Sequence, residues 1–278
     1  MSYDVLGAAA LNYAPCKYAT CRVLFRGPER RLDAPYIAFL GGTDTYGKFI
    51  KTPFPALVES CLGVNCINFG IVNAGVDVFM HDSFLTNAAN GATATVLQIV
   101  GAQNLSNRFY TVHPRRNDRF LKASPLLAAI YPEVDFSEFH FTRHMLSTLY
   151  KVSAPRFTTV RRELQEAWTS RMKLLCERLN GQVIMLWFSD HAPPSTQTNL
   201  IDPSQDSDPL FVTQEMLNEL LQKVAGYVEV TASLEALEAG TEGMVFRELE
   251  ALAALRLMGP RAHGEAVGPL SKALQPFL

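Results

Sequence analysis

The chain has no run of about 18 consecutive apolar residues, so the sequence predicts no membrane-spanning helix. Its first residues carry Asp4 and no basic flank before a short apolar stretch, so we expect neither a secretory signal nor an anchor there. The formal net charge is only -2, with 25 Lys and Arg against 27 Asp and Glu. Such a balance gives no overall field that would collect nucleic acid or an anionic membrane. We therefore expect a cytoplasmic protein in which any anion site is local.

Cysteine is also scarce, and its pattern excludes a disulfide framework. The five cysteines form an odd set scattered over different predicted elements, which favours a reducing compartment. Cys16 and Cys21 in "PCKYATC" resemble half of a metal site, but no second pair of Cys or His residues follows at zinc spacing. The sequence thus predicts no metal and no cofactor.

Apolar residues are plentiful, and they gather in five short runs. With 278 residues, 48% hydrophobic and 19% charged, the chain can bury a sizeable core. The runs are "YIAFL" (36–40), "CINFGIV" (66–72), "ATVLQIV" (94–100), "QVIMLWF" (182–188) and "YVEVTA" (227–232). Each run is continuous rather than alternating, which is typical of strands buried on both faces of a parallel sheet.

Helical patterns separate these runs. The clearest spans 156–180, where apolar residues recur at helical spacing and Asn180-Gly181 supplies a stop. Alternating strands and helices favour a three-layer α/β/α fold with a five-stranded parallel, flavodoxin-like sheet of strand order 2-1-3-4-5.

Residues 102–155 break the alternation between the third and fourth strands. This stretch is longer than a crossover requires, and such insertions are more often functional cover than filler. A second irregular segment, "HAPPSTQTNLIDPSQDSDP", follows the fourth strand and reads as an exposed loop or lid. We expect one α/β domain over 1–278 with an inserted cover at about 102–155.

A polar turn, "GGTDTYG", follows the first predicted strand. Parallel sheets bind ligands at the carboxyl ends of their strands, near the point where strand order reverses, and in this order that point lies between strands one and three. The turn after strand one and "GAQN" after strand three would meet there. We expect substrate contacts from Asp44 and Tyr46 in the first turn and from Asn73 after the second strand.

These loops resemble the conserved blocks of the SGNH or GDSL hydrolases. "FLGGTDTYG" is similar to the first block, with Thr43 at the position of the serine nucleophile; "NFGIVNAG" supplies Gly70 for the second block, and "GAQNLSN" places Asn104 near the third. The resemblance implies an SGNH-like fold and ester hydrolysis or O-acyl transfer. The chain is also similar to an uncharacterised bacterial family whose members carry "GGTxTYGKF" and "DHAPP" stretches.

The chain departs from the SGNH pattern in three ways. Gly42 replaces the aspartate of the first block, and Thr43 replaces the serine. The C-terminal segment "MVFRELEALAALRLMGPRAHGEAVGPLSKAL" has no Asp-x-x-His, and His263 there matches a helix start rather than the base. The general base implied by the resemblance is therefore missing from its usual place.

Candidate roles follow from the chemistry of acyl transfer. Thr43 becomes a nucleophile only if a base lies within hydrogen-bond reach; it otherwise contacts a ligand or caps the next helix. The backbone N–H groups of Thr43 and Gly70, with the Asn104 amide, would surround an oxyanion. His191, in "FSDHAPP", is the best candidate base, or a loop residue bonded to carbonyl groups. Asp190 beside it should point elsewhere unless the loop turns sharply.

The insertion carries a cluster of basic residues. "HPRRNDRF" and "FHFTRHM" supply Arg115, Arg116, Arg119, Arg143 and His144. Guanidinium groups recognise phosphate, sulfate or carboxylate through paired hydrogen bonds, although acidic neighbours could equally leave these arginines as a solvated loop. We expect the cluster to approach the cleft lined by Thr43 and Asn104.

Taken as a whole, the sequence favours an esterase or O-acyltransferase-type enzyme acting on a small molecule, with an anionic one favoured. The alternatives are a non-hydrolytic anion- or ligand-binding protein on the same scaffold, and a sulfuryl or phosphoryl transferase. Nucleic acid and membranes are not expected partners. Formation of a homo-oligomer stays open.

Overall fold

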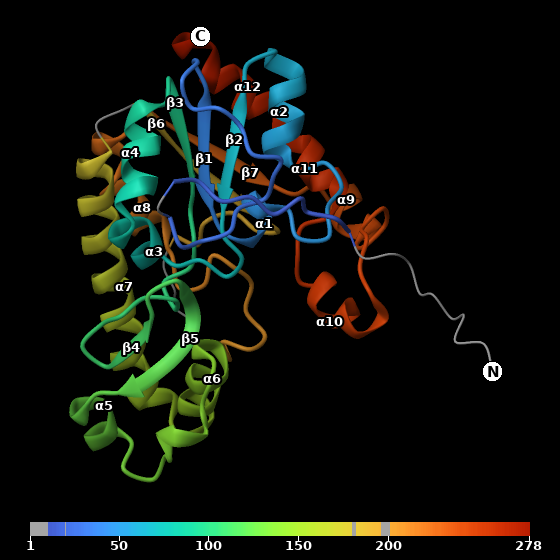
Figure 1. Cartoon of the computed structure of the whole chain (residues 1–278). Helices are drawn as coiled ribbons and strands as arrows, with labels where there is room; N and C mark the ends of the chain where they lie inside the picture. The colour runs from blue at the N-terminus through green and yellow to red at the C-terminus, as the bar shows by residue number, and fades with distance from the viewer. Residues whose placement is uncertain (1–10, 20, 180–181, 196–200) are drawn as a thin grey trace, which may run out of the picture.

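A five-stranded parallel sheet forms the centre of the molecule (Figure 1). The computed structural model describes residues 11–19, 21–179, 182–195 and 201–278. The strands are β1 (Ile37–Gly41), β2 (Cys66–Gly70), β3 (Ala94–Gln98), β6 (Val183–Ser189) and β7 (Gly226–Thr231). Their order is β2-β1-β3-β6-β7, and every neighbouring pair is parallel. The predicted sheet and its strand order are confirmed.

Two apolar layers cover the two faces of this sheet. Every residue of β1, β3 and β6 is buried, because helices pack on both sides. Successive residues of β1 point to opposite faces, so Ala38 and Leu40 join one core cluster while Ile37 and Phe39 join the other. Along β7, at the sheet edge, Val228 and Val230 are buried and alternate with exposed residues.

Helices from different parts of the chain form the outer layers. On the face of Ala38 and Leu40 lie α3 (Val76–His81), α4 (Ser83–Gly91) and α7 (Ala154–Arg178). On the face of Phe39 lie α2 (Phe54–Leu62), α11 (Pro260–Glu265) and α12 (Val267–Leu274). The predicted helix over 156–180 corresponds to α7, which begins two residues earlier because the Ser153 hydroxyl caps it by accepting from the Arg156 N–H.

Shorter elements complete the chain. They are α1 (Thr43–Tyr46), α5 (Pro125–Ile130), α6 (Thr142–Val152), α8 (Gln214–Asn218), α9 (Leu234–Ala239), α10 (Ala251–Ala254) and the 3-10 turns η1 (Phe136–Glu138), η2 (Leu221–Lys223), η3 (Glu248–Glu250) and η4 (Gln275–Phe277). In the described part of the chain, no helix has the length and apolar character needed to cross a membrane.

The long segment between β3 and β6 has structure of its own. It forms an antiparallel hairpin of β4 (Tyr110–His113) and β5 (Arg116–Ala123), followed by α5, η1 and α6. These elements lie beyond the carboxyl end of β3, at the lower end of the molecule in Figure 1. Phe109, Phe120 and Met145 belong to the same core cluster as the sheet, so the insertion packs on the body through apolar side chains.

Asn117 fastens the hairpin to the body. Its Oδ1 accepts from the backbone N–H groups of Gly75 and Val78 at 3.0 and 3.1 Å, and its Nδ2 donates to the His113 carbonyl at 3.1 Å. The N-cap of α3 is Gly75, which has no side chain, so Asn117 supplies the missing cap from another element. The buried amide thereby fixes β5 against the loop after β2.

Replacing Asn117 by Ala should destabilise the fold by about 1 to 3 kcal/mol, because two buried N–H groups lose their acceptor. Urea unfolding followed by circular dichroism measures this. The control is Asn218→Ala, which removes only an exposed side-chain bond with Gln214 and should change stability by less than about 0.5 kcal/mol. Equal stability of the two variants would contradict the capping role.

Candidate functional site

A cleft of about 700 Å³ opens at the carboxyl ends of the strands. Its polar lining comes from the loops after β1, β2, β3 and β6, whereas α9, α10 and the segment up to α11 supply an apolar side. This is the edge at which parallel sheets bind ligands. The residues of the polar side are Gly42, Thr43, Asp44, Lys48, Asn73, Gln98, Gln103, Asn104, Arg143, Ser189, Asp190 and Ser204–Asp208, and Arg256 adds a charged group to the apolar side.

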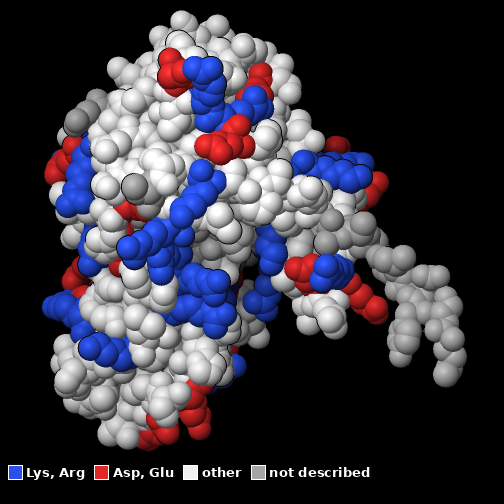
Figure 2. Space-filling model, viewed as in Figure 1, with Lys and Arg blue, Asp and Glu red and all other residues white. Residues whose placement is uncertain are grey.

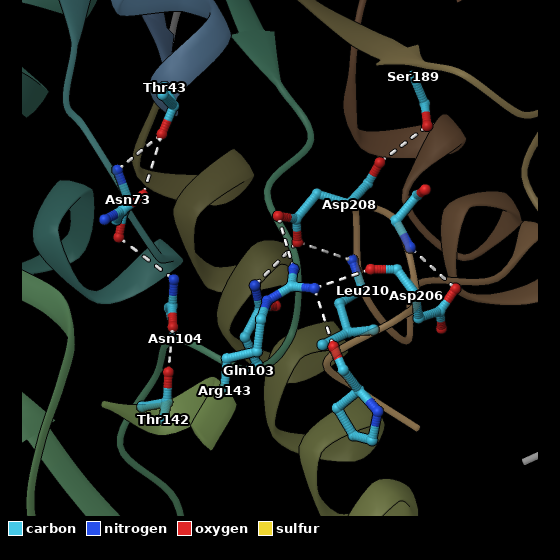
Figure 3. Close-up of polar contacts among 12 residues, drawn as sticks. Thr43, Asn73, Gln103, Asn104, Thr142, Arg143, Ser189, Asp206, Asp208 and Leu210 are labelled. Atoms are coloured by element: carbon cyan, nitrogen blue, oxygen red, sulfur yellow. Dashed lines mark hydrogen bonds and ion pairs between the residues drawn. The ribbon is translucent and has the colours of Figure 1, made fainter. Parts of the chain in front are cut away.

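The hydroxyl of Thr43 is held by Asn73 (Figure 3). Thr43 Oγ1 accepts from the Asn73 backbone N–H at 2.9 Å and donates to Asn73 Oδ1 at 3.3 Å. Asn73 has a left-handed backbone, with φ 55°, which is uncommon outside glycine and concentrates at functional sites. In the described part of the chain no base contacts the Thr43 hydroxyl, and no side-chain cap bond forms at α1.

Asn104 and Gly70 lie on the predicted edge, but their polar groups already have partners. Asn104 Nδ2 donates to the Asn73 carbonyl at 3.3 Å, and its Oδ1 accepts from the Thr142 hydroxyl at 2.6 Å. The Gly70 N–H donates to Asn68 Oδ1 at 2.8 Å. A side chain at position 70 would meet backbone of α1, so this glycine serves close packing of α1 on β2. The Gly70 N–H is therefore already used, whereas Asn104 uses one of its two amide N–H donors on Asn73.

Gln98, the last residue of β3, organises the turn after β1. Its Oε1 accepts from the N–H groups of Gly42 and Thr45 at 3.0 and 3.2 Å and from the Thr45 hydroxyl at 2.6 Å. Its Nε2 therefore points the other way and donates to Asp44 Oδ2 at 3.3 Å. The sequence interpretation passed over Gln98, although one amide in the apolar run "ATVLQIV" was a signal for it.

Asp44 is a cleft carboxylate without a cationic partner. Its Oδ1 accepts from the Met258 N–H at 3.4 Å, and no ion pair to it forms among the described residues. Burial raises the pKa of Asp44 to about 6, and the nearby charge of Asp208 adds to the effect, whereas the hydrogen bonds from Met258 and Gln98 oppose it. A carboxyl group that titrates near neutral pH inside a cleft can both take up and return a proton.

Ser189, Asp190 and His191 form a cluster at the end of β6. His191 Nδ1 lies 2.7 Å from Asp190 Oδ1 and 2.9 Å from Ser189 Oγ. Of the two alternatives for Asp190, the structure has the sharply turning loop, which brings its carboxylate to His191, and the contact lowers the pKa of Asp190. In a catalytic triad the serine and the carboxylate bind opposite ring nitrogens, but here both contact Nδ1. Ser189 and Asp190 line the cleft, whereas the described lining contains no histidine.

Arg143 of α6 holds the loop after β6 (Figure 3). Its guanidinium donates to the carbonyls of Pro203 and Asp206 at 2.9 and 2.8 Å and to Asp208 Oδ2 at 2.8 Å. Gln103 Nε2 donates to the other oxygen of Asp208 at 2.9 Å. Arg143 thus lines the cleft, and it uses three of its five N–H donors on protein groups.

The remaining predicted contacts lie outside the described cleft lining. Arg115 and Arg116 are exposed at the hairpin tip, and Arg119 lies over the Phe141 ring at 4.2 Å. His144 packs edge-on against Phe139, and Tyr46 packs against Tyr13. Figure 2 shows Lys and Arg side chains gathered over the middle of one face, where the N-terminal segment and the start of β5 lie in Figure 1.

Two lining cations that the sequence interpretation missed are Lys48 and Arg256. Neither forms an ion pair with a carboxylate in the described part of the chain. Lys48 Nζ lies 4.7 Å from the centre of the Phe49 ring. These groups are better placed than the hairpin arginines to meet an anion in the cleft.

His263 is a core residue under the apolar side of the cleft. It is fully buried between the rings of Phe54 and Phe188, and its Nδ1 accepts from the Phe54 N–H at 3.1 Å. Burial lowers its pKa to about 3, so the imidazole stays neutral. Its position agrees with the expectation that His263 is not the base.

No group of His, Cys, Asp and Glu side chains suited to a metal ion occurs in the described ranges. The five cysteines are free thiols, and Cys21 donates to Asp82 rather than meeting Cys16 in a site.

Comparison with known proteins identifies the family. The family described as "Domain of unknown function (DUF6473)" matches residues 1–278, so the chain belongs to it. Among curated proteins, none matches. Among solved structures, the chain is similar to the lipase Lip_vut3 from a goat rumen metagenome, with TM-score 0.41 and 10% identity over 88% of this chain and 97% of that one. It is also similar to a gut microbial diltiazem-metabolizing enzyme, with TM-score 0.33 and 12% identity over 87% of this chain and 47% of that one. Likenesses this remote say nothing about the reaction.

Asp44 should make stability fall as the pH rises. Its folded pKa of about 6 lies above the unfolded value of 3.8, so the ionised group destabilises the fold above pH 6 and the penalty vanishes below 3.8. Asp44→Asn should therefore be more stable than the wild type by about 1 to 2 kcal/mol at pH 7.5 and no more stable at pH 3.5. Urea unfolding at both pH values measures this, with Asp33→Asn as an exposed control. A gain that is equal at both pH values would show that the charge of Asp44 is not responsible.

Proposed function

We propose that this member of the DUF6473 family is an ester hydrolase or O-acyltransferase whose general base is Asp44. The observation that carries the proposal is a carboxylate without a cationic partner, with a pKa near 6, in a cleft at the carboxyl edge of the sheet. A base of this pKa is ionised at neutral pH and still strong enough to accept a proton in a transition state. Gln98 and the Met258 N–H orient both carboxylate oxygens.

In the proposed reaction, Asp44 takes up one proton and returns it within one catalytic cycle. Asp44 takes a proton from water, or from the hydroxyl of an acyl acceptor, as that oxygen attacks the ester carbonyl carbon. The bond between the carbonyl carbon and the leaving alkoxide then breaks, and the protonated Asp44 gives its proton to the alkoxide oxygen. Lys48 and Arg256 supply positive charge for the developing oxyanion or for an anionic group of the substrate.

Thr43 acts in this proposal as a positioning residue. Its hydroxyl is engaged with Asn73 on both sides, and a hydroxyl becomes a nucleophile only beside a base that can take its proton. Thr43 instead fixes the turn that carries Asp44. The Asn73 bridge to Asn104 keeps the loops after β1, β2 and β3 in register.

A ligand-binding protein without turnover is the second candidate. The observation that favours it is that the side chains of Thr43 and Asn104 are committed to internal hydrogen bonds and that the described lining holds no histidine. The two candidates differ in whether Asp44 moves a proton, so turnover separates them.

The pH dependence of turnover tests the base. With 4-nitrophenyl acetate as the probe, kcat/KM should rise about tenfold per pH unit below pH 6 and level off above it, because only ionised Asp44 is active. Asp44→Asn should lower the plateau by about 10²- to 10⁴-fold. Asp33→Asn should leave it unchanged. If the wild type and Asp44→Asn both hydrolyse the probe at the buffer rate while folded, the ligand-binding candidate is favoured.

Thr43 variants separate positioning from nucleophilic catalysis. Thr43→Ala should lower kcat/KM by less than about tenfold, because the turn relaxes but the base remains, and Thr43→Ser should stay close to the wild type. A burst of nitrophenol in the wild type, with complete loss of turnover in Thr43→Ala, would instead make Thr43 the nucleophile.

A further inference from the structure

The side of the cleft that faces Asp44 from the C-terminal part of the chain is apolar. It is lined by Ala236, Leu237, Ala253–Leu255, Leu257, Met258 and Ala262, with Arg256 as the charged exception. The opposite side holds the carboxylates and amides of the β-strand loops. A cleft of about 700 Å³ has room for a drug-sized molecule, which exceeds what the ester group alone needs. The apolar side of the cleft therefore has room for a part of the ligand other than the ester group.

Most of the apolar side belongs to an excursion of the chain between Gly240 and Gly259, and Ala236, Leu237 and Ala262 lie just outside it. The two glycines meet at the neck, where a Cβ on Gly259 would lie 2.5 Å from the Gly240 carbonyl. The Val245 N–H donates to the Phe49 carbonyl at 2.8 Å, and the Met258 N–H donates to Asp44 at 3.4 Å. Figure 2 shows the part of the molecule that carries α10 as a lobe set off from the body by a hollow. The excursion is thus tied directly to the proposed base.

Leucines continue the apolar side to the outer surface. Leu249, Leu252 and Leu255 recur every three residues through η3 and α10 and are 99%, 80% and 67% exposed. Leu237 and Leu255 belong both to the exposed set and to the cleft lining. Single exposed leucines are ordinary, but a row that runs into a cleft marks a binding surface.

We propose that the excursion wall, Leu237 with Ala253–Met258, binds an aliphatic chain of the substrate and so makes medium-chain esters the substrate class. This rests on the proposed function only in placing the ester group at Asp44. A chain is the occupant because the apolar lining includes Met258, whose N–H meets that carboxylate, and extends to the exposed Leu255, with Arg256 as the one charged side chain between them. Glu248 and Glu250 flank the exposed leucines and offset the charges of Arg247 and Arg256, so the patch has no net positive charge to attract an anionic lipid surface.

Binding of n-alcohols tests the wall without requiring turnover. Calorimetric titration with 1-butanol, 1-hexanol and 1-octanol should give a Kd that falls about fourfold per added methylene, the ratio expected when each one is buried. Leu255→Ser with Leu237→Ser should reduce the dependence to less than twofold per methylene. Leu126→Ser, at an exposed position of α5 outside the cleft lining, is the matched control and should keep the wild-type slope.

Turnover then separates this inference from the proposed function. Chain-dependent binding with no hydrolysis of 4-nitrophenyl octanoate would support the wall and defeat only the esterase. Hydrolysis at equal kcat/KM for acetate and octanoate, with no chain dependence in the titration, would overturn the wall and leave the esterase. A wild-type dimer in sedimentation that becomes monomeric on Leu252→Ser, without any alcohol binding, would show that a second copy covers the leucines and would also overturn it.

Discussion

The hydrogen bonds of the Gln98 side chain hold the proposed site together. Its oxygen accepts from Gly42 and twice from Thr45, which leaves its NH₂ group only one direction, toward Asp44. Because three donors fix the oxygen, the amide cannot flip without leaving buried N–H groups unpaired. The end of β3 thereby sets the position of the carboxylate that follows β1. Loss of Gln98 would disturb the turn, the carboxylate and the register between the two strands together.

The hydrogen-bond and charge partners of Arg143 and Asp44 explain why the two residues differ in role. Arg143 donates hydrogen bonds to two backbone carbonyls and to the Asp208 carboxylate, so it stabilises the loop after β6. Only its remaining N–H donors are available to a ligand. Asp44 receives two long hydrogen bonds and no positive charge, so burial keeps its pKa high. A charged group that the fold satisfies is structural, whereas one that the fold leaves without a counter-charge is available for chemistry.

The sequence was sufficient for the sheet because continuous apolar runs and helical spacers are local signals. Strand order followed from the general behaviour of such sheets, and Thr43, Asp44, Asn73 and Asn104 came to one edge because that edge is set by topology. The prediction that the hairpin arginines approach the cleft was less successful. The position of an insertion depends on long-range contacts such as that of Asn117 with Gly75, which residue spacing does not predict. Gln98 was missed although its amide in an apolar run was a signal, and Lys48 was missed although it follows Asp44 by four residues. The leucine excursion was missed because nothing in its own segment marks it as a neighbour of Asp44.

Asp44 and the excursion wall depend on each other physically. The Met258 N–H that donates to the carboxylate comes from the wall. The apolar side chains of that wall lower the local polarity and so destabilise the ionised form of Asp44. A chain lying along Leu237 and Leu255 would exclude more water and raise the pKa of Asp44 further, which strengthens the base but reduces its ionised fraction at a given pH. A positive charge in the lining close to the carboxylate would act in the opposite direction, and Lys48 is the lining cation that follows α1. The working pH of the site would then be a balance between the apolar wall and one ammonium group, both of which lie outside the turn that carries the carboxylate.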